Sequence, residues 1–302
     1  MSAAGDAPRA TPGDPPRLGF LGTGWIGRHR MTAIAASGHA TVAAVADAAP
    51  ASAEAAAAAA PGAAVVDSLD ALLALDLDGI VIATPSALHA EQAVRALERG
   101  CAVFCQKPLA RTAEETRAVV DAARAADRLL GVDLSYRETA GMRAIRALVA
   151  DGALGHVHAV DLTFHNAYGP DKAWFYDPAL AGGGCVIDLG IHLVDLALWT
   201  LDFPPVVGAH GRLFAKGQAL VDPTTAVEDH ALATLDLAGG TVVRLACSWH
   251  LSAGQDAVIE AAFYGSEGGA ALRNVDGSFY DFTAHRFRGT AREALALPPD
   301  DW

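Results

Sequence analysis

The sequence predicts an α/β fold of two domains, in which a domain built on a parallel sheet precedes an α+β domain with a mostly antiparallel, open sheet. Two patterns lead to this prediction. From Arg17 to about residue 136, short apolar runs alternate with longer helical patterns, as in strand–helix units that form a parallel sheet. Beyond residue 136, two helices are followed by several strand-like runs. The 302 residues are enough for two domains, which we place at 17–136 and 137–302.

The composition is that of a compact globular protein, since hydrophobic residues make up 52% of the chain and charged residues only 19%. The formal net charge of -13 disfavours general binding to nucleic acid or anionic lipid, which depends on clustered Lys and Arg side chains. We therefore expect a small molecule as the main partner of this chain.

The first 16 residues do not resemble an export signal, because they lack an apolar segment and a paired arginine. They are predicted to form a flexible tail. No apolar run reaches the roughly 20 residues that cross a bilayer, so we expect no membrane partner. The cysteines form neither a C-x-x-C pair nor a disulfide scaffold; they are Cys101, Cys105, Cys185 and Cys247. These features predict a cytoplasmic protein.

Six strands and the helices between them are expected in the first domain. The strands are Arg17–Leu21, Thr41–Ala46, Ala63–Val66, Gly79–Ala83, Cys101–Phe104 and Leu129–Leu134. The alanine-rich segment 52–60 is followed by Pro61 and Gly62, so high helix propensity and a stop signal agree there. A helix over 112–126 begins with Thr112, and Glu115 three residues later completes a capping box.

The second domain begins with a helix over 138–150, a strand over 156–165 and an apolar helix over 185–201. Five strand-like runs follow and are interpreted as a meander: Val206–Phe214, Val227–Asp236, Thr241–Ser248, Ala257–Tyr264 and Gly269–Asn274. Gly239 and Gly240 lie between two of these runs, where a tight hairpin turn requires residues with positive φ.

A glycine-rich turn provides the first candidate site, because Gly22-Thr23-Gly24-Trp25-Ile26-Gly27 follows a predicted strand and opens a predicted helix. In such a motif the first glycine permits the turn, the second lets the backbone approach a pyrophosphate, and the third lets helix and strand pack closely. Asp47 ends the second strand, where an acidic side chain accepts hydrogen bonds from an adenosine ribose. No arginine follows Asp47, so the sequence favours NAD over NADP.

Two further segments follow strands at the same end of the sheet, where open α/β folds place ligands. Thr84, Pro85 and His89 follow the fourth strand, and Gln106 and Lys107 follow the fifth. Other readings remain open here, because a Thr-Pro pair also starts helices and a lysine at a strand end is commonly a solvated charge.

The apolar helix predicted over 185–201 carries three polar residues, Asp188, His192 and Asp195, whose i, i+4 and i+7 spacing places them on one helical face. Oxidation of a hydroxyl group needs a proton acceptor, and a histidine oriented by a carboxylate can serve. A buried structural histidine and a metal site in a hydrolase are the alternatives. Nothing nearby completes a metal shell, so we predict no metal.

Four segments together resemble the glucose-fructose oxidoreductase and inositol dehydrogenase family, known as Gfo/Idh/MocA. They are GFLGTGWIG (19–27), ATPSALH (83–89), CQKPLA (105–110) and GGGCVIDLGIHLVDLALW (182–199). The resemblance covers residues 17 to about 201, and the last third of the chain is similar only in its sheet-like pattern.

The resemblance implies a Rossmann domain that binds NAD, followed by a substrate domain whose open sheet forms subunit interfaces in a homodimer or homotetramer. It implies an NAD(P)-dependent dehydrogenase or reductase that acts on a CH–OH group of a sugar, cyclitol or related polyol. Its catalytic residues are expected to be Lys107, Asp188 and His192, with a cis bond between Lys107 and Pro108. The expected cofactor contacts are Gly22, Gly24, Trp25, Ile26, Gly27, Asp47, Thr84, Pro85, His89, Gln106 and Lys107. The expected substrate contacts are Tyr136, Arg137, His165, Asn166, Lys172, Trp174, Asp188 and His192.

The sequence departs from the family pattern at two places. Family members usually have glutamate where this chain has Gln106, so one negative charge beside Lys107 is missing. A cofactor-binding regulator without turnover is therefore an alternative function. The sequence also ends at Trp302, where relatives commonly continue with a further helix, so we expect the chain to be incomplete at this end.

Overall fold

The computed structural model describes residues 14–300 and 302, so most of the predicted tail (1–16) lies outside the described residues. The chain divides into two compact units, Met1–Asp133 and Leu134–Trp302. Each unit has its own sheet and its own hydrophobic core. The two units are described separately below.

The first unit contains a six-stranded sheet in the order β3-β2-β1-β4-β5-β6, in which all neighbouring strands are parallel. The strands are β1 (Arg17–Leu21), β2 (Thr41–Ala46), β3 (Ala64–Val66), β4 (Gly79–Ile82), β5 (Ala102–Gln106) and β6 (Leu130–Asp133). The helices are α1 (Trp25–Ser37), α2 (Pro50–Ala59), α3 (Leu69–Leu73), α4 (Ser86–Glu98) and α5 (Ala113–Ala126). All six predicted strands are confirmed, with small shifts at their ends.

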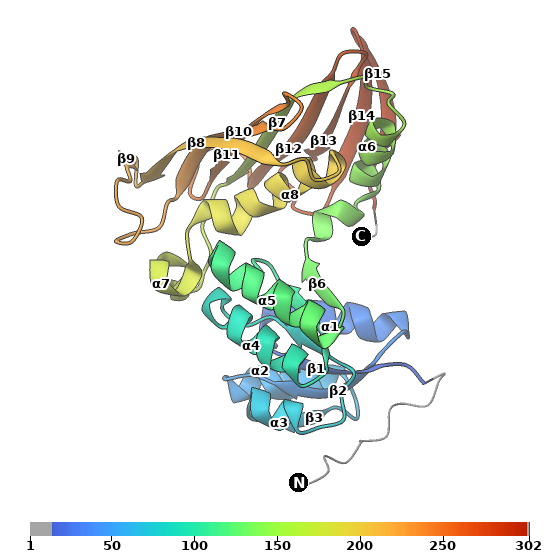
Figure 1. The fold of residues 1–302 in the computed structure, drawn as a ribbon, viewed down its shortest axis with the longest axis vertical. Coiled ribbons are helices and arrows are strands. Elements are labelled where there is room, and N and C mark those ends of the chain that lie inside the picture. Colours follow the sequence, from blue (N-terminus) through green and yellow to red (C-terminus); the bar gives the residue numbers. More distant parts are fainter. Residues whose placement is uncertain (1–13, 301) are drawn as a thin grey trace. The chain divides into compact units, whose positions relative to one another are not determined.

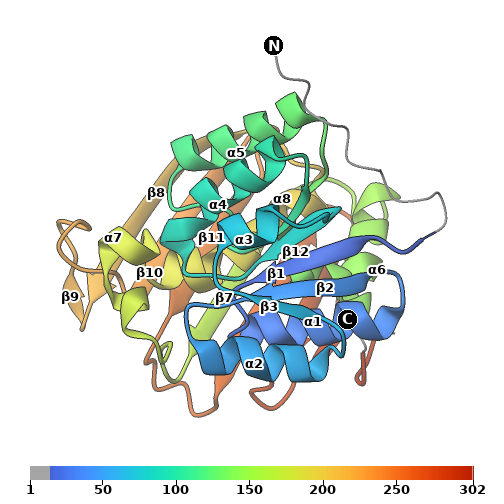
Figure 2. The same ribbon diagram turned by 90° about the horizontal axis from the view of Figure 1, so that it is seen from below.

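Helices cover both faces of this sheet (Figure 2). On one face, α1 and α2 bury Met31 and Ala56 against Phe20 of β1. On the other face, α3, α4 and α5 form the larger core with Ile80 and Ile82. Both faces of β4 are thus buried, which explains its uninterrupted apolar run. The predicted start of α5 is also confirmed, because the Thr112 hydroxyl accepts a hydrogen bond from the Glu115 N–H at 3.1 Å.

The second unit contains a nine-stranded sheet in the order β15-β14-β13-β12-β7-β11-β10-β8-β9. Its strands are β7 (Val157–Asn166), β8 (Val206–Ala215), β9 (Gln218–Ala219), β10 (His230–Leu237), β11 (Val242–Ser248), β12 (Ala257–Gly265), β13 (Gly269–Asn274), β14 (Phe282–Arg288) and β15 (Ala291–Ala296). The meander prediction was wrong in one respect: β7 lies between β11 and β12 and pairs with β11 in parallel. Helical segments and the strands β8 to β10 lie between β7 and both of its partners in the sequence, and sequence order alone does not reveal such an insertion.

Two details of this sheet concern the predicted turns and strand ends. Gly239 and Gly240 have φ values of +97° and +90°, so the predicted tight hairpin between β10 and β11 is confirmed. The strand predicted from Val227 begins only at His230, because Glu228 is used in contacts with another segment, described below.

The helical segments of the second unit are η1 (Ser135–Glu138), α6 (Ala140–Ala150), η2 (Ala173–Tyr176), α7 (Pro178–Ala181), η3 (Val186–Gly190) and α8 (Ile191–Thr200). The predicted helix over 138–150 therefore starts later, at α6, where the Thr139 hydroxyl accepts from the Met142 N–H at 3.2 Å. The predicted helix over 185–201 begins with a π-helical turn, in which the Ile191 N–H bonds to the Val186 carbonyl.

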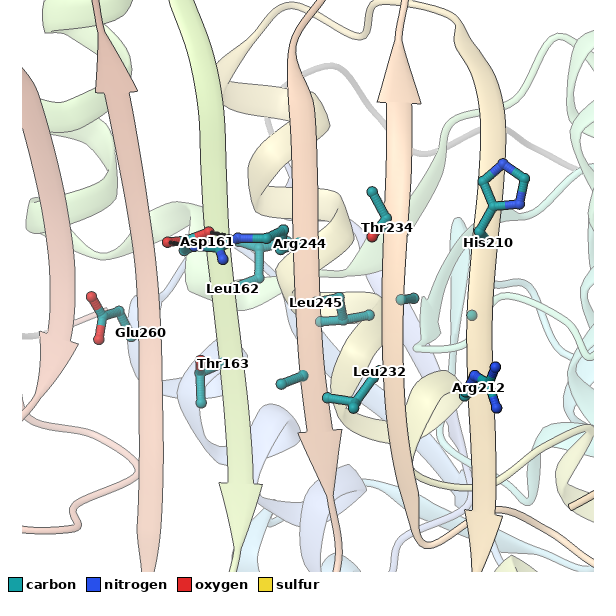
Figure 3. Close-up of a pocket in the computed structure, with 13 residues that line it drawn as sticks. Asp161, Leu162, Thr163, His210, Arg212, Leu232, Thr234, Arg244, Leu245 and Glu260 are labelled. Atoms are coloured by element: carbon teal, nitrogen blue, oxygen red, sulfur yellow. Dashed lines mark hydrogen bonds and ion pairs between the residues drawn. The ribbon is translucent and has the colours of Figure 1, made fainter. Parts of the chain in front are cut away.

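Helices α6 and α8 pack on one face of the nine-stranded sheet (Figure 1). The opposite face carries polar side chains (Figure 3), where Arg244 of β11 is paired with Asp161 of β7, its Nε lying 2.6 Å from Oδ1. No helix of the second unit covers that face in the part of the chain that the structure describes. The open sheet implied by the family resemblance is therefore present.

One helical segment, Pro178–Thr200, is long and apolar enough to cross a membrane by length and composition, although no apolar run of that length was expected. Within it, α8 packs Leu193 and Leu196 into the core of the second unit, where both side chains are buried. The buried helix of a folded core has this same composition, so the segment is weak evidence for a membrane span.

Candidate active site

The glycine turn between β1 and α1 leaves space beside a helix N-terminus. Gly22 has φ +85°, and a Cβ there would lie 2.6 Å from the backbone of Ala83. A Cβ on Gly27 would collide with the Gly22 carbonyl oxygen, whereas a Cβ on Gly24 would meet nothing within 4 Å. Gly22 and Gly27 are thus required by packing, and Gly24 leaves an open approach to the first N–H groups of α1. A pyrophosphate group fits this arrangement.

Asp47 lies beside this turn and is fixed in orientation by three donors. Its Oδ2 accepts from the Thr23 N–H at 2.6 Å and from the Thr23 hydroxyl at 3.3 Å. Its Oδ1 accepts from the Ala49 N–H at 2.8 Å. The carboxylate therefore stands at the carboxyl end of β2, adjacent to the glycine turn. Trp25, which is 65% exposed, and the half-buried Ile26 follow Gly24 at the start of α1.

His89 of α4 connects two of the predicted cofactor segments. Its ring is 1% exposed, with Nδ1 lying 2.7 Å from the Pro108 carbonyl oxygen and Nε2 lying 2.7 Å from the Thr84 carbonyl oxygen. Burial lowers the pKa of His89, and the two carbonyl contacts oppose that effect. Both ring nitrogens face the protein, so His89 is placed to position the segments around Thr84 and Lys107.

Gln106 and Lys107 follow β5, and Gln106 contacts the end of β6. The Gln106 Nε2 donates to Oδ2 of Asp133 at 2.6 Å, and Nε of Arg30 in α1 reaches the same oxygen at 2.5 Å. Asp133 is 5% exposed, so this buried carboxylate depends on both donors. The peptide bond between Lys107 and Pro108 is cis, as the family resemblance implied. Thr84, whose hydroxyl bonds to Gln92 at 2.6 Å, and Pro85 precede α4 nearby.

In the second unit, a buried glutamate holds the segment that contains the predicted catalytic residues Asp188 and His192. Glu228 is 4% exposed, and its Oε1 accepts from the N–H groups of Gly184 and Val186, each at 2.9 Å. A Cβ on Gly184 would collide with the Glu228 backbone, which explains the glycine at that position. The Gly-rich run therefore serves the close approach of Glu228.

Asp188 and His192 each contact an aromatic side chain from another segment of the second unit. Oδ2 of Asp188 accepts a hydrogen bond from the indole Nε1 of Trp249 at 3.0 Å. The ring of His192 packs edge-on against Tyr136, with 5.0 Å between ring centroids. Burial and then the negative charge of Asp188 raise the pKa of Tyr176, so Tyr176 also lies in the field of this carboxylate.

The structure brings some of the predicted substrate residues together within the second unit. Tyr136 is 8% exposed and packs on His192, while the neighbouring Arg137 forms an ion pair with Asp195 of α8, its Nε lying 2.6 Å from Oδ2. These contacts place η1 beside α8. Arg137 also lies over the ring of Phe203, at 5.4 Å from the ring centroid, so its guanidinium is held by the protein on two sides.

The other predicted substrate residues lie elsewhere in the second unit. His165 bonds to the Ser248 hydroxyl at 2.7 Å and stacks on His230 at 6.1 Å; Ser248 alternates along β11 with Cys247, which faces the helices. His165 therefore lies on the sheet face opposite to α8. Asn166 closes a turn by accepting from the Tyr168 N–H at 2.9 Å. On the following loop, Lys172 pairs with Asp171 at 2.6 Å and Trp174 stacks on Phe175 at 3.8 Å.

Sequence reasoning missed Glu228 and Trp249, which both contact the helical segment that carries the predicted catalytic residues. Glu228 stands beside Asp229 before a strand, and such a pair normally indicates solvated charges. Trp249 follows a strand, and no pattern links it to Asp188, which lies 61 residues away in the sequence. Only the fold brings these residues together.

Residues 14–300 and 302 contain no cluster of three or more His, Cys, Asp or Glu side chains able to hold a metal ion. The four cysteines are buried and free. Burial raises the pKa of Cys105 to about 12, so this thiol is kept protonated.

Two family descriptions match the chain. Residues 17–134 match "Oxidoreductase family, NAD-binding Rossmann fold", and residues 142–271 match "GFO/IDH/MocA C-terminal domain". Among curated relatives, D-glucoside 3-dehydrogenase of Escherichia coli (strain K12) is 32% identical over 78% of this chain and 68% of the relative. Inositol 2-dehydrogenase of Rhizobium meliloti (strain 1021) is 32% identical over 85% of this chain and 76% of the relative.

Solved structures agree with these matches. GenD2 from gentamicin A biosynthesis, in complex with NAD, is 27% identical with a TM-score of 0.79, covering 92% of this chain and 78% of that chain. Levoglucosan dehydrogenase, in complex with NADH and levoglucosan, has a TM-score of 0.81 at 23% identity over 93% of this chain and 79% of that chain, and shows the same fold. The resemblance found in the sequence is confirmed: the chain belongs to the Gfo/Idh/MocA family of oxidoreductases, and its first unit is an NAD-binding Rossmann domain.

Proposed function

We propose that this oxidoreductase uses NAD to interconvert a secondary hydroxyl group and a carbonyl group on a sugar, glycoside or cyclitol. The observation that carries the proposal is the open approach at Gly24 to the N-terminus of α1, with the fixed carboxylate of Asp47 beside it. A polar cradle that a single Cβ would fill suits a pyrophosphate group, and a carboxylate at the end of β2 suits a ribose.

We further propose that Asp47 makes NAD the preferred cofactor over NADP. Both of its oxygens are oriented by backbone N–H groups of Thr23 and Ala49, so the carboxylate is preorganised to accept from ribose hydroxyls. A 2′-phosphate would meet this negative charge, and Ala48 and Ala49 offer no compensating cation.

The chemistry that bound NAD supplies is the acceptance of a hydride from the carbon that carries the hydroxyl group. The proton on the hydroxyl oxygen must also be removed, and a side chain of the protein must accept it. We assign its removal from the hydroxyl oxygen to the imidazole of His192, which Tyr136 fixes in orientation. Trp249 holds Asp188 through a hydrogen bond, and Glu228 fixes the start of the helical segment that carries it. The Asp188 carboxylate stabilises the positive charge on the imidazole of His192. The ammonium group of Lys107 donates a hydrogen bond to the same hydroxyl oxygen.

The substrate class is proposed from the relatives, whose names specify D-glucosides and inositol. Rings with several hydroxyl groups need hydrogen-bonding side chains beside the reacting groups. We retain Asn166, Lys172 and Trp174 as candidate contacts, since they lie on the end of β7 and the loop that follows it. We propose that Tyr136 and Arg137 hold His192 and Asp195 in place. His165 bonds to Ser248 on the sheet face opposite to α8, so we do not propose it as a substrate contact.

We also propose that the protein is a cytoplasmic homodimer or homotetramer. The free cysteines fit a reducing compartment. The open sheet face presents both signs of charge, since the Arg244–Asp161 pair lies between Glu260 of β12 and Arg212 of β8 (Figure 3), so the same surface on a second copy can be complementary to it.

The experiment is an absorbance screen at the reduced nicotinamide band, run with NAD and with NADP across glucosides, aldoses, amino sugars and cyclitols. We expect reduction of NAD with at least one polyol, and slower or no reduction of NADP. Absence of turnover with every polyol, while NADH still binds, would favour the regulator alternative.

A further inference from the structure

Two donors of the first unit converge on one oxygen of the buried Asp133 carboxylate, at the end of β6. Nε of Arg30 lies 2.5 Å from Oδ2, and Nε2 of Gln106 lies 2.6 Å from the same oxygen. Asp133 is 5% exposed, so little water competes for these bonds. Hydrogen bonds to a buried carboxylate are stronger than bonds between neutral groups, and both donor side chains are therefore held firmly.

The side-chain amide of Gln106 connects this carboxylate to the backbone of Lys107. Its Nε2 donates to Asp133, while its Oε1 accepts from the Lys107 N–H at 3.2 Å. A carboxylate only accepts and a backbone N–H only donates, so these two neighbours together fix which end of the amide faces which partner. A glutamate at this position could accept from Lys107 but could not donate to Asp133.

The backbone around Lys107 is held on its other side as well. Nδ1 of the buried His89 lies 2.7 Å from the carbonyl oxygen of Pro108, the residue that follows Lys107. Pro108 is itself buried. The half-buried Lys107 side chain therefore starts from a backbone that Gln106 fixes before it and His89 fixes after it. With the backbone fixed, only rotations of the side chain decide where the ammonium group lies.

We propose that Asp133 is a positioning residue for Lys107 and that it acts through the amide of Gln106. The inference rests on the proposed function, because it concerns how Lys107 reaches the hydroxyl group of the substrate. Misplacing a reacting group by about 1 Å can cost about 100-fold in rate, so the orientation of this segment matters for turnover. By this inference, glutamine at position 106 belongs to a working catalytic site and does not indicate a regulator without turnover.

Arg30 gives the network a second connection. It extends from α1, the helix whose N-terminus faces the proposed pyrophosphate site, and it bonds to the same oxygen of Asp133 as Gln106 does. Asp133 thus ties the cofactor helix to the segment that carries Lys107.

The test measures kcat and KM of NAD-saturated variants with a polyol that the wild type oxidises. Asp133→Leu and Gln106→Met each break the connection, so we expect kcat to fall about tenfold or more in both while KM and NADH affinity stay within about twofold. Asp133→Asn keeps an acceptor oxygen for Gln106 and Arg30, so its kcat should stay within about threefold of wild type. The control for lost stability is Val119→Ala, which truncates a buried core side chain of the same unit and should keep kcat.

A second background separates positioning from a merely structural effect. Because Asp133 acts through Lys107 in this proposal, Asp133→Leu should lower kcat by less than about twofold when Lys107→Ala is already present. A loss in that background as large as in the wild type would overturn the inference. Wild-type kcat in both Asp133→Leu and Gln106→Met would also overturn it.

A nuclear magnetic resonance readout keeps the inference testable if the proposed activity fails. The lysines of the chain are Lys107, Lys172 and Lys216, so reductive methylation with ¹³C-formaldehyde gives few signals, and Lys107→Arg identifies the one from Lys107. In Asp133→Leu this signal should move toward those of the exposed Lys172 and Lys216. Such a movement, with no polyol oxidised by the wild type, would support the positioning while the activity fails. An unmoved signal beside normal wild-type turnover would overturn the inference and leave the activity standing.

Discussion

The side-chain amide of Gln106 donates a hydrogen bond to the buried carboxylate of Asp133, with 2.6 Å between Nε2 and Oδ2. Arg30 donates to the same oxygen from α1, so one carboxylate connects β5, β6 and a helix. The family usually has glutamate at this position, and a glutamate here would direct a second carboxylate at Asp133. A glutamine at position 106, which can donate a hydrogen bond, therefore suits the buried carboxylate of Asp133 better than a glutamate would.

Gln106→Glu is expected to lower the free energy of unfolding by about 1–3 kcal/mol at pH 7, because two carboxylates would share a buried site. The loss should shrink near pH 4, since one carboxyl group of the pair can take a proton there. Urea unfolding at both pH values measures this effect. Gln106→Met, which removes the hydrogen bond without adding charge, should show a loss that does not shrink in this way. Equal stability of wild type and Gln106→Glu at pH 7 would contradict the account.

Gly24 and Gly27 are expected to respond differently to the same substitution. Gly27→Ala should destabilise the first unit by about 3 kcal/mol, since its Cβ would collide with the Gly22 carbonyl. Gly24→Ala should cost less than about 1 kcal/mol, because nothing lies within 4 Å of its Cβ. It should still weaken NADH binding by about tenfold or more, since the methyl group would occupy the phosphate approach. Thermal unfolding and NADH titration of both variants check this contrast, and unchanged NADH affinity in Gly24→Ala would exclude the phosphate site.

Arg137 is expected to matter for stability more than for substrate affinity. The Asp195 carboxyl is 9% exposed, and burial raises its pKa in spite of the Arg137 guanidinium. Arg137→Ala should therefore lower the free energy of unfolding by about 2–3 kcal/mol, because a buried carboxylate would lose its partner. Arg143→Ala, which breaks the exposed pair with Glu138, should change it by less than about 0.5 kcal/mol. A raised KM with unchanged stability in Arg137→Ala would instead support direct substrate contact.

His165 makes stability depend on pH. Burial, and then the positive charge of His230, hold the pKa of His165 below its usual 6.5. The unfolded chain therefore binds a proton that the folded chain does not, so stability falls as pH falls below 6.5. Wild type should lose more Tm between pH 7 and pH 5 than His165→Asn does. The variant His39→Asn changes an exposed histidine and should follow wild type. Identical pH slopes in all three proteins would refute this role of His165.

Much of the first unit could be predicted from local signals. The fully apolar run of β4, the hydroxyl of Thr112 and the glycines between β1 and α1 act over a few residues, and the structure shows each in its expected place. Asp47 was expected beside the glycine turn because the strand–turn–helix arrangement fixes where an acidic side chain must stand, and its side chain lies there.

The second unit was less predictable because its contacts join segments that are distant in sequence. Insertion of β7 between β11 and β12 is decided by packing across the sheet. The hydrogen bonds from the Gly184 N–H to Glu228 and from the Trp249 indole to Asp188 span 44 and 61 residues, and no periodic pattern encodes them. The π-helical turn of η3 likewise departs from the regular helix that the sequence suggested over 185–201.

We propose that Lys107 and His192 both take part in the same reaction. The most direct measurement is a double-mutant cycle on kcat/KM with Lys107→Ala, His192→Ala and the double variant, using a polyol that the screen identifies. We expect each single variant to lose about 100-fold or more while NADH affinity is retained, and the double variant to be little worse than either, as for groups that work as a unit. Wild-type turnover in either single variant, or losses that multiply as for independent sites, would contradict the claim.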